Sequence, residues 1–334
     1  MGKQVVLSGS VAYDYIMRFP GHFNEHILPE HLERLSLSFL VEDMRREHGG
    51  VAGNISYTMG LLGERPFLFA TAGQDFGEYR DWLEAHNVDT SGVTVIPDKF
   101  MASFFVNTDL GNRQIAAFYT GAMGDAAQLS LYDLNSENIE FVVVSPNAPE
   151  AMAKTARECK ELGIPYVYDP SQQIVRLDAE ELLAGIGGSL MLVVNDYELN
   201  LIEKKTGLQS AEIRAMTGTL VVTRGEHGVS IIADESYHVH AALTENAADP
   251  TGIGDAFRGG LLRARVAGAD WETAARIGAL AATYCLEVVG PQAQTYTPEE
   301  FVVRYEQVYG DAEPARAILL PTTDDRRPTT ERTA

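Results

Sequence analysis

Apolar runs that alternate with amphipathic segments constrain the fold of this chain more than any other feature of its sequence. Runs rich in apolar residues begin at Pro66, Phe141 and Leu190, and a segment with a helical pattern follows each of them. The run Phe141–Ser145 consists mainly of β-branched and aromatic residues, which is typical of a strand buried on both faces. Strands that alternate with helices form a mostly parallel sheet with helices on both faces. We therefore expect an α/β fold of three layers, helix, sheet and helix.

Three further strand patterns do not join this alternation. The segments Leu35–Val41, Ala102–Thr108 and Gln114–Tyr119 alternate as half-covered strands do, and they flank the helical region 53–62. We interpret them as a small separate sheet that covers a ligand, which we call the lid. The predicted organisation is one domain over residues 1–320, with lid segments at about 14–48 and about 98–120, and a tail over 321–334. The tail has almost no apolar residue, so we expect it to be disordered.

The acidic composition excludes some classes of partner. The 334 residues include 47 acidic and 26 basic ones, for a net charge of −21. A surface of this charge argues against a nucleic-acid partner, because phosphate backbones require basic patches. No apolar run approaches the roughly 18 residues of a membrane helix. Two cysteines make no disulfide framework and no apolar leader precedes the strand at Gln4, so we expect a cytoplasmic protein without a membrane partner.

The stretch Asp249–Leu262 carries the strongest chemical signal. Two of its glycines, Gly252 and Gly254, lie just before a helical pattern, where a bend can point successive N–H groups one way. Unpaired N–H groups at a helix N-terminus bind anions. Asp255 is a poor anion ligand but a suitable base beside a phosphoryl group in transfer. The alternative is that Asp255 caps a helix and the glycines only form a loop.

Two motifs carry a resemblance to a known family. The motif Asp249–Asp255 resembles the C-terminal signature of the ribokinase-like carbohydrate and purine kinases, and Gly49–Asn54 resembles their N-terminal signature. Within that family, the stretches Gly9–Asp14, Asp169–Gln173 and Asn195–Glu198 are most similar to bacterial adenosine kinases of the mycobacterial type. The resemblance implies a ribokinase-like fold and ATP-dependent phosphorylation of the 5′-hydroxyl of adenosine to AMP. It also implies that lids pair two subunits, so we expect a homodimer.

The resemblance also implies roles for individual residues on the phosphate side. Asp255 would be the base, and the N–H groups of Gly252, Ile253 and Gly254 would stabilise the transferring group. Asn195 and Glu198 would place Mg²⁺ through water, although Glu198 could instead be a first-turn acid of a helix. A monovalent cation such as K⁺ would lie near Asp249 and Thr251, unless Asp249 is only a turn residue. The contacts to ATP would come from Asn195, Thr223, Gly225, Gly228, Thr251, Gly252 and Gly254.

The residues that bind the substrate are predicted from the lid segments and from the stretches that carry the resemblance. The resemblance implies that Ser10 and Asp14 bind ribose hydroxyls. Three phenylalanines on lid segments could sandwich a purine, or else pack the lid or form a dimer interface. The predicted substrate-binding residues are Ser10, Asp14, Ser38, Phe39, Gly50, Asn54, Phe104, Phe118, Met123, Gln172, Gln173 and Asp255. A ribokinase- or fructokinase-like sugar kinase would share both signatures, and a non-catalytic nucleoside- or sugar-binding protein is the alternative of another class.

Other motifs are absent or do not fit their chemistry. No Walker A motif occurs, and no Gly-x-Gly-x-x-Gly stands at a first strand-to-helix turn, which counts against a P-loop or a dinucleotide fold. The segment His22–His26 formally fits a zinc-binding pattern, but Pro20 and Pro29 bracket it, so we expect no metal there. The segment Leu286–Gln292 matches no family pattern, so contacts to the ATP adenine stay unassigned.

Overall fold

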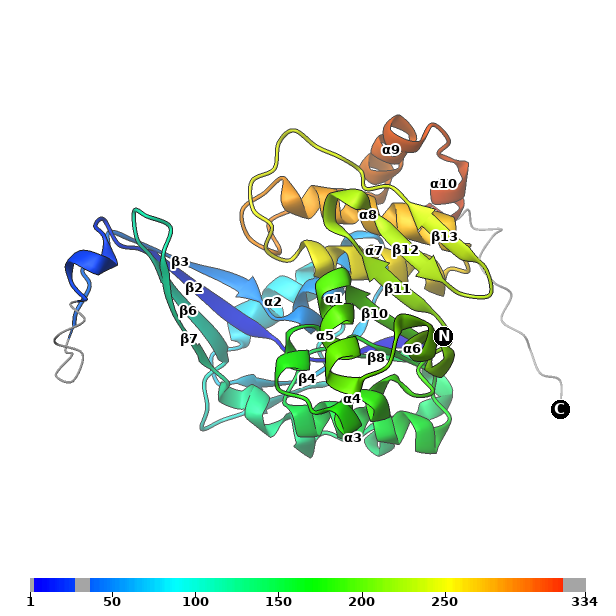
Figure 1. The fold of residues 1–334 in the computed structure, drawn as a ribbon, viewed down its shortest axis with the longest axis horizontal. Coiled ribbons are helices and arrows are strands. Elements are labelled where there is room, and N and C mark those ends of the chain that lie inside the picture. Colours follow the sequence, from blue (N-terminus) through cyan, green and yellow to red (C-terminus); the bar gives the residue numbers. More distant parts are fainter. Residues whose placement is uncertain (1–2, 28–36, 321–334) are drawn as a thin grey trace.

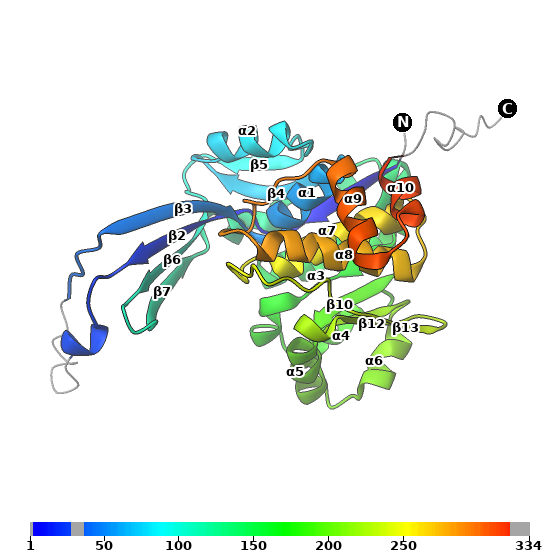
Figure 2. The same cartoon turned by 90° about the horizontal axis from the view of Figure 1, so that it is seen from above.

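The computed structural model describes residues 3–27 and 37–320, which form a large sheet between two helical layers and a smaller sheet that projects from it (Figures 1 and 2). The large sheet has nine strands in the order β13-β12-β11-β10-β9-β8-β1-β4-β5. These strands are β1 (Gln4–Ser8), β4 (Phe67–Gly73), β5 (Val93–Ile96), β8 (Ile139–Val144), β9 (Tyr166–Tyr168), β10 (Met191–Asn195), β11 (Leu220–Thr223), β12 (Val229–Ile232) and β13 (Ser236–Val239).

All neighbouring strands from β11 to β5 run parallel, and only β12 and β13 are antiparallel. The helices of the described chain are α1 (Val51–Leu61), α2 (Gly77–Ala85), α3 (Pro149–Leu162), α4 (Ala179–Ile186), α5 (Asp196–Thr206), α6 (Ser210–Met216), α7 (Ile253–Val266), α8 (Trp271–Leu286), α9 (Pro298–Tyr309) and α10 (Glu313–Leu319). The predicted three-layer α/β fold with a β-sheet lid is therefore confirmed.

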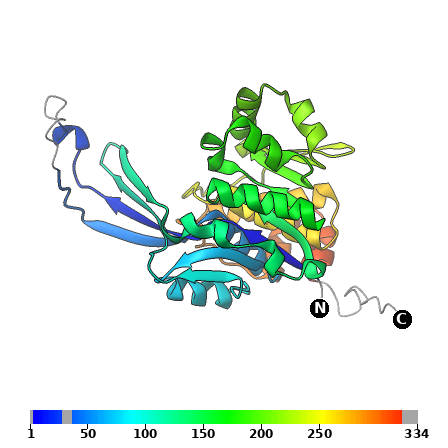
Figure 3. The ribbon, with the colours of Figure 1, turned by 90° about the horizontal axis from the view of Figure 1, so that it is seen from below.

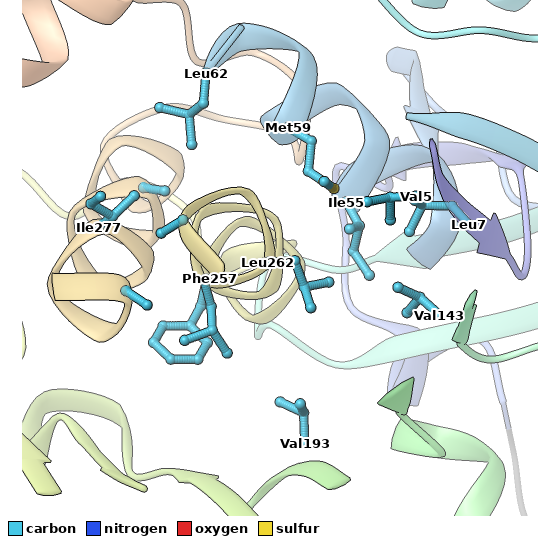
Figure 4. Packing of buried hydrophobic residues seen from close by; sticks show 14 of the residues in the cluster. Val5, Leu7, Ile55, Met59, Leu62, Val143, Val193, Phe257, Leu262 and Ile277 are labelled. Carbon is cyan, nitrogen blue, oxygen red and sulfur yellow. The ribbon is translucent and has the colours of Figure 1, made fainter. Parts of the chain in front are cut away.

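Alternate residues of the same strands supply the two cores. On one face of the sheet, side chains such as Val5 and Leu7 pack against α1, α7 and α8, and Figure 4 shows this packing around Ile55 and Leu262. On the other face, residues such as Val6 pack against α3, α4, α5 and α6. Because the central strands, such as β8 and β10, are buried on both faces, they are almost wholly apolar, which is why their sequences predicted them.

Helix α7 packs closely against α1 on one side and against α8 on the other because of two glycines, Gly259 and Gly260. A Cβ on Gly259 would lie 2.6 Å from Thr58 Cβ of α1. A Cβ on Gly260 would lie 2.9 Å from Gly278 Cα of α8. This close packing fixes α7 between its two neighbours and so fixes the position of its N-terminal turn.

The lid is a four-stranded mixed sheet in the order β3-β2-β6-β7. Its strands are β2 (Ala12–Arg18), β3 (Asp43–Gly49), β6 (Ala102–Thr108) and β7 (Gln114–Tyr119). β2 pairs with β6 in parallel, and the other two pairs are antiparallel. The lid extends well away from the helical layers, as seen from two sides in Figures 1 and 3.

The edge strand of the lid beside β2 differs from the prediction. Strands β6 and β7 were predicted correctly, but the described part of the predicted strand Leu35–Val41 is not a strand. The pairing position belongs instead to β3, whose charged sequence, with two arginines and a glutamate, does not resemble a buried strand. β3 lies at the edge of the lid, where charged side chains are common because they discourage pairing with other chains.

Two further predictions meet the limits of the described residues. The tail predicted over 321–334 lies outside them, and so do the first two residues, Leu35 and Ser36, of the predicted strand Leu35–Val41. Within the described ranges, no helix has both the length and the apolar character needed to cross a membrane.

Candidate active site

Helix α7 is preceded by a glycine in the left-handed conformation. Gly252, the residue before the helix, has φ of 81°. The first helical hydrogen bond runs from Ala256 N to Gly252 O at 2.9 Å, so the N–H groups of Ile253 and Gly254 precede the intrahelical ladder. These N–H groups and the positive end of the helix have the geometry of the anion site that the sequence predicts.

Asp255 stands in the first turn of α7, directly beside this anion site. Asn54 Nδ2 of α1 donates a hydrogen bond to Asp255 Oδ2 at 2.8 Å. Burial raises the pKa of Asp255, and the Arg258 charge and the Asn54 hydrogen bond oppose that shift. A largely buried carboxylate with a raised pKa, next to an anion site, is suited to accept a proton.

Asp14 brings a second carboxylate from the lid to this site. It lies on β2 opposite Glu47 of β3, and a Cβ on Gly49 would lie only 2.8 Å from Asp14 Oδ2. Burial, together with the charges of Asp255 and Glu47, raises the pKa of Asp14 to about 6. The structure therefore brings Asp14 and Asp255 together, although they are far apart in the sequence.

The predicted site residues of the stretches Gly9–Asp14 and Gly49–Asn54 also stabilise the local backbone. Ser10 Oγ accepts a hydrogen bond from Val51 N at 3.1 Å, so it helps to start α1. Gly50 has φ of 86°, and a Cβ there would lie 2.6 Å from Ser10 O. Gly50 is thus required for the contact between two chain segments. Asn54 accepts from Gln292 Nε2 at 2.9 Å while it donates to Asp255, so its amide orientation is held from both sides.

On the nucleotide side, Asn195 and Glu198 form a capping box at the start of α5. Asn195 Oδ1 accepts from Glu198 N at 2.7 Å, and Glu198 Oε2 accepts from Asn195 N at 2.8 Å. Among the described residues, no cluster of three or more His, Cys, Asp or Glu could hold a metal ion. Glu198 uses only Oε2 in the capping box, so its Oε1 is left for a ligand. A single carboxylate of this kind fits an ion such as Mg²⁺, which retains most of its waters.

The other predicted nucleotide residues follow the neighbouring strand. Thr223 ends β11 beside Asn195 in the parallel register. Gly225 has φ of 56° with open space around its Cβ position. A Cβ on Gly228 would lie 2.0 Å from Val239 O, so the packing of the adjacent strand requires this glycine. Thr223 and Gly225 thus lie where the carboxyl ends of parallel strands bind ligands in α/β sheets.

Asp249 and Thr251 form the turn before α7. Asp249 Oδ1 accepts from Thr251 N at 2.9 Å, and Asp249 Oδ2 accepts from Gly290 N at 3.1 Å. These hydrogen bonds lower the pKa of Asp249 although partial burial opposes them. The geometry is that of a turn aspartate, which was the alternative to a cation ligand.

Two of the three lid phenylalanines share a row with Asp14. Across the sheet, Phe104 pairs with Asp14 on one side and with Phe118 on the other, so their side chains point to the same face. Phe118 is 51% exposed on that face. Glu47 completes the row on β3. An aromatic surface therefore continues from the two carboxylates along the lid.

Phe39 does not join this row. Its ring packs against Phe19 and Phe23 with centroid distances of 5.0 Å and 4.9 Å, in a cluster beyond the outer end of β2. Ser38, its neighbour, is exposed. The sequence could not separate Phe39 from the other two phenylalanines, because its strand assignment there was wrong.

The remaining predicted substrate residues lie at the base of the lid and after β9. Met123 is buried with Ala12 and Ala102. Gln173 is buried, and its Oε1 has no hydrogen-bond partner among the described residues. Gln172 is exposed and accepts from Ser171 Oγ at 2.7 Å. Gln173 is thus the glutamine of this pair with an unused buried acceptor.

Three buried polar residues near Asp255 were missed from the sequence. Arg258 lies one helical turn after Asp255, Asp169 directly follows β9, and Gln292 comes from the segment that matched no pattern. Arg258 was visible as a charge inside the otherwise small and apolar stretch 256–262 of α7. The stretch Asp169–Gln173 carries part of the family resemblance, but nothing in the sequence indicates that Asp169 contacts Arg258 or that Gln292 reaches the same site.

The fold and the site together define a class of enzyme: an α/β enzyme with a lid, an anion site at a helix N-terminus and a carboxylate base candidate beside it. Residues 4–298 match the family model for the pfkB family carbohydrate kinases, and the chain belongs to this family. The protein is accordingly a phosphotransferase that uses an alcohol group as acceptor, as the sequence predicted.

Within this family, the chain is similar to several nucleoside kinases. A nucleoside kinase of Methanothermobacter thermautotrophicus is 28% identical over 92% of this chain and 97% of its own length. The structure of Burkholderia thailandensis nucleoside kinase in complex with inosine is 38% identical, with a TM-score of 0.81 over 92% of this chain and 98% of that one. The same enzyme in complex with ADP-inosine aligns with a TM-score of 0.80 over 92% of this chain and 96% of that one.

Proposed function

We propose that this protein is an ATP-dependent nucleoside kinase that phosphorylates the 5′-hydroxyl of adenosine to AMP, a purine salvage reaction. The observation that carries the proposal is the position of Asp255. Its carboxylate stands beside the anion site of α7 and beside Asp14, which begins the aromatic row of the lid. The anion site, Asp14 and the aromatic row thus follow one another in the same order as the phosphate, the ribose and the base of a nucleotide. The nucleoside kinases to which the chain is similar support the same acceptor class.

The proposed reaction is an in-line transfer of the ATP γ-phosphoryl group. The nucleoside 5′-hydroxyl gives its proton to Asp255, its oxygen forms a bond to the γ-phosphorus, and the bond to the ADP oxygen breaks. The N–H groups of Ile253 and Gly254 stabilise charge on the transferring group. Mg²⁺, when held through water near Asn195 and Glu198, would neutralise part of the phosphate charge.

Recognition of the acceptor is assigned to the lid and the β9 segment. Asp14 is positioned to accept from ribose hydroxyls, and the one N–H of Asn54 that Asp255 does not use is free to donate. Phe104 and Phe118 offer flat apolar surface to the purine, which a plain sugar would not use. Gln173 Oε1, buried without a partner in the described chain, supplies an acceptor for a base or ribose donor.

A parallel assay with ATP, Mg²⁺ and K⁺ tests the proposed acceptor. Adenosine, inosine, guanosine, ribose and fructose are offered, and ADP formation is measured. We expect turnover of adenosine well above that of either sugar. Turnover of a sugar alone would favour a carbohydrate kinase and remove the purine role of Phe104 and Phe118. Tight nucleoside binding with no turnover of any acceptor would favour the binding-protein alternative. Omission of K⁺ tests the cation proposed at Asp249 and Thr251.

The Asp255→Asn variant tests the proposed base. General base catalysis contributes roughly 10²–10⁴-fold to rate, so we expect kcat to fall by about this factor. Calorimetry should show adenosine binding within a few-fold of the unaltered protein, because the amide keeps the shape of the carboxylate. Turnover that persisted near the original rate would remove Asp255 from the mechanism.

A further inference from the structure

Arg258 is a buried cation directly behind the site, and the reaction as described does not use it. Its side chain is 10% exposed, and it lies one turn after Asp255 on α7. Arg258 Nη1 is 3.8 Å from Asp255 Oδ1. A charge is removed from water here at considerable free-energy cost, which requires compensating partners.

Those partners come from the central sheet. Arg258 Nη2 donates to Asp169 Oδ1 at 2.8 Å, and Arg258 Nε lies 2.7 Å from Asp169 Oδ2. The Asp169 side chain is fully buried, and its backbone N–H donates to Val144 O of β8 at 2.9 Å. The guanidinium is therefore held by one hydrogen bond to Oδ1 and by a close ion pair with Oδ2 of a carboxylate that the sheet itself fixes.

The anion site leaves room for this guanidinium. A Cβ on Gly254 would lie 2.8 Å from Arg258 Nη1. Gly254 is one of the two glycines of the motif, and it is not in the left-handed region, so conformation alone does not require a glycine there. The approach of Arg258 gives a physical reason for the missing side chain.

A second, uncharged arm holds the other oxygen of Asp255. Asn54 Nδ2 donates to Asp255 Oδ2, and Gln292 Nε2 donates to Asn54 Oδ1. Gln292 in turn accepts from Trp82 Nε1 at 3.1 Å. Asp255 is thus contacted on one side by Arg258, which Asp169 holds, and on the other by Asn54, which Gln292 holds. The first of these pairs is charged, and the second, called the Gln292–Asn54 arm, is neutral.

We propose that Arg258, held by Asp169, is a positioning residue for phosphoryl transfer, which orients the Asp255 carboxylate and keeps it ionised beside the anion site. The Gln292–Asn54 arm orients the same carboxylate without contributing a charge. This inference rests on the proposed role of Asp255 as the base. Asp169 and Arg258 do not need to touch the substrate to act in this way.

Several elements bring charged and titratable groups toward Asp255. Arg258 faces it from α7, Asn54 from α1 and Glu198 from α5, while the Asp14 carboxyl approaches from the lid. Three further groups are near enough to interact with its charge: Tyr79 of α2, Cys285 of α8 and Asp169, which follows β9.

These surroundings decide the expected pH effect. Burial and Glu198 raise the pKa of Asp255, and Arg258 is the cation that lowers it. Loss of the Arg258 charge should therefore raise the pKa of Asp255 further.

The pH profile of kcat/KM for the nucleoside tests the proposal. In Arg258→Met, we expect the acidic limb to move up by about one pH unit or more, the usual effect of losing a close opposite charge. We expect kcat to fall roughly 10–100-fold through misplacement of the base, with KM little changed. Arg258→Lys keeps the charge but not the two-point contact with Asp169, so its acidic limb should stay near the original and its kcat should recover in part.

The controls separate charge, orientation and folding. Gln292→Met should lower kcat without moving the acidic limb. Arg263→Met removes another buried arginine from α7, whose Nε donates to Leu62 O at 3.0 Å, and it should reduce stability without moving the limb. If Arg258→Met does not fold, the Arg258→Met/Asp169→Asn double variant removes the pair together and should show the same shift.

Two different results would contradict the positioning role of Arg258 and the base role of Asp255, respectively. A folded Arg258→Met or double variant with an unmoved acidic limb and unchanged kcat would overturn the positioning role and leave Arg258 as a packing residue. Full turnover by Asp255→Asn would instead overturn the proposed base, whatever the Arg258 variants show.

Discussion

Several residues of the predicted site also stabilise local structure. Asn195 and Glu198 cap α5 with each other, Ser10 starts α1, and Asp249 closes the turn before α7. An N-terminal cap contributes about 1 kcal/mol to stability. Variants at these positions therefore lose stability and activity together, so a loss of activity alone does not identify a ligand contact. Asp14 and Asp255 are different, because burial makes their charges a cost to the folded state.

Asp14→Asn should stabilise the protein at neutral pH while it impairs nucleoside binding. The folded pKa of Asp14 is about 6, above its ordinary value of 3.8. A raised carboxyl pKa means that ionisation destabilises the folded state, fully so above about pH 6 and not at all below about pH 4. Two pKa units correspond to about 2.7 kcal/mol, and partial exposure reduces this to roughly 1–2 kcal/mol.

Urea unfolding without ligands, at about pH 7.5 and about pH 4.5, measures this effect. The unfolding free energy of Asp14→Asn should exceed that of the unaltered protein at the higher pH by more than at the lower pH. A difference that does not change with pH would mean that the Asp14 charge is not strained.

At the scale of elements, apolar pattern predicted the body and missed part of the lid. Buried parallel strands such as β8 are apolar on both faces, so composition alone identifies them. β3 is a charged edge strand, and its pairing with β2 depends on long-range register that the sequence does not display. The glycine motif likewise predicted where α7 begins and that Asp255 stands in its first turn, because both features depend on residues close together in the sequence. The pair Arg258–Asp169 spans 89 residues, and only the fold brings it together.

The N-terminal turn of α7 should be sensitive to Gly252→Ala. Gly252 has φ of 81°, and a Cβ there would lie 2.4 Å from Pro291 Cβ. Left-handed backbone costs a non-glycine residue about 1–2 kcal/mol, and the clash adds to this cost. Gly63→Ala is a matched control, with φ of 79° and open space at its Cβ position.

Thermal unfolding and steady-state kinetics of the two variants separate the causes. We expect Gly63→Ala to lose about 1–2 kcal/mol of stability and to keep its kcat. Gly252→Ala should lose more stability and also kcat, since the N–H groups of the anion site move with the turn. Equal losses of stability with unchanged kcat would show that the contact with Pro291 and the position of the turn are unimportant.

At the scale of the whole molecule, the lid has two faces of different character. Asp14, Phe104 and Phe118 lie on one face, toward the site. The alternate residues lie on the opposite face, which exposes apolar side chains on three strands: Met44, Phe105, Ile115 and Tyr119. A contiguous exposed apolar surface on a projecting sheet is typical of a protein interface. We propose that two copies pair through this outer face, in line with the homodimer predicted from the sequence.

Charge placed on the outer face should therefore dissociate the dimer. Ile115 is 43% exposed on β7, so Ile115→Lys introduces a charge without disturbing a buried core. Val303, 54% exposed on α9 and away from the lid, gives the matched control Val303→Lys. Light scattering coupled to gel filtration should give a dimer mass for the unaltered protein and the control, and a monomer mass for Ile115→Lys. Because Asp14 and Phe104 point to the other face, a monomeric variant that kept full nucleoside turnover would show that each lid closes its own site. A monomeric unaltered protein would instead leave the outer face without this partner.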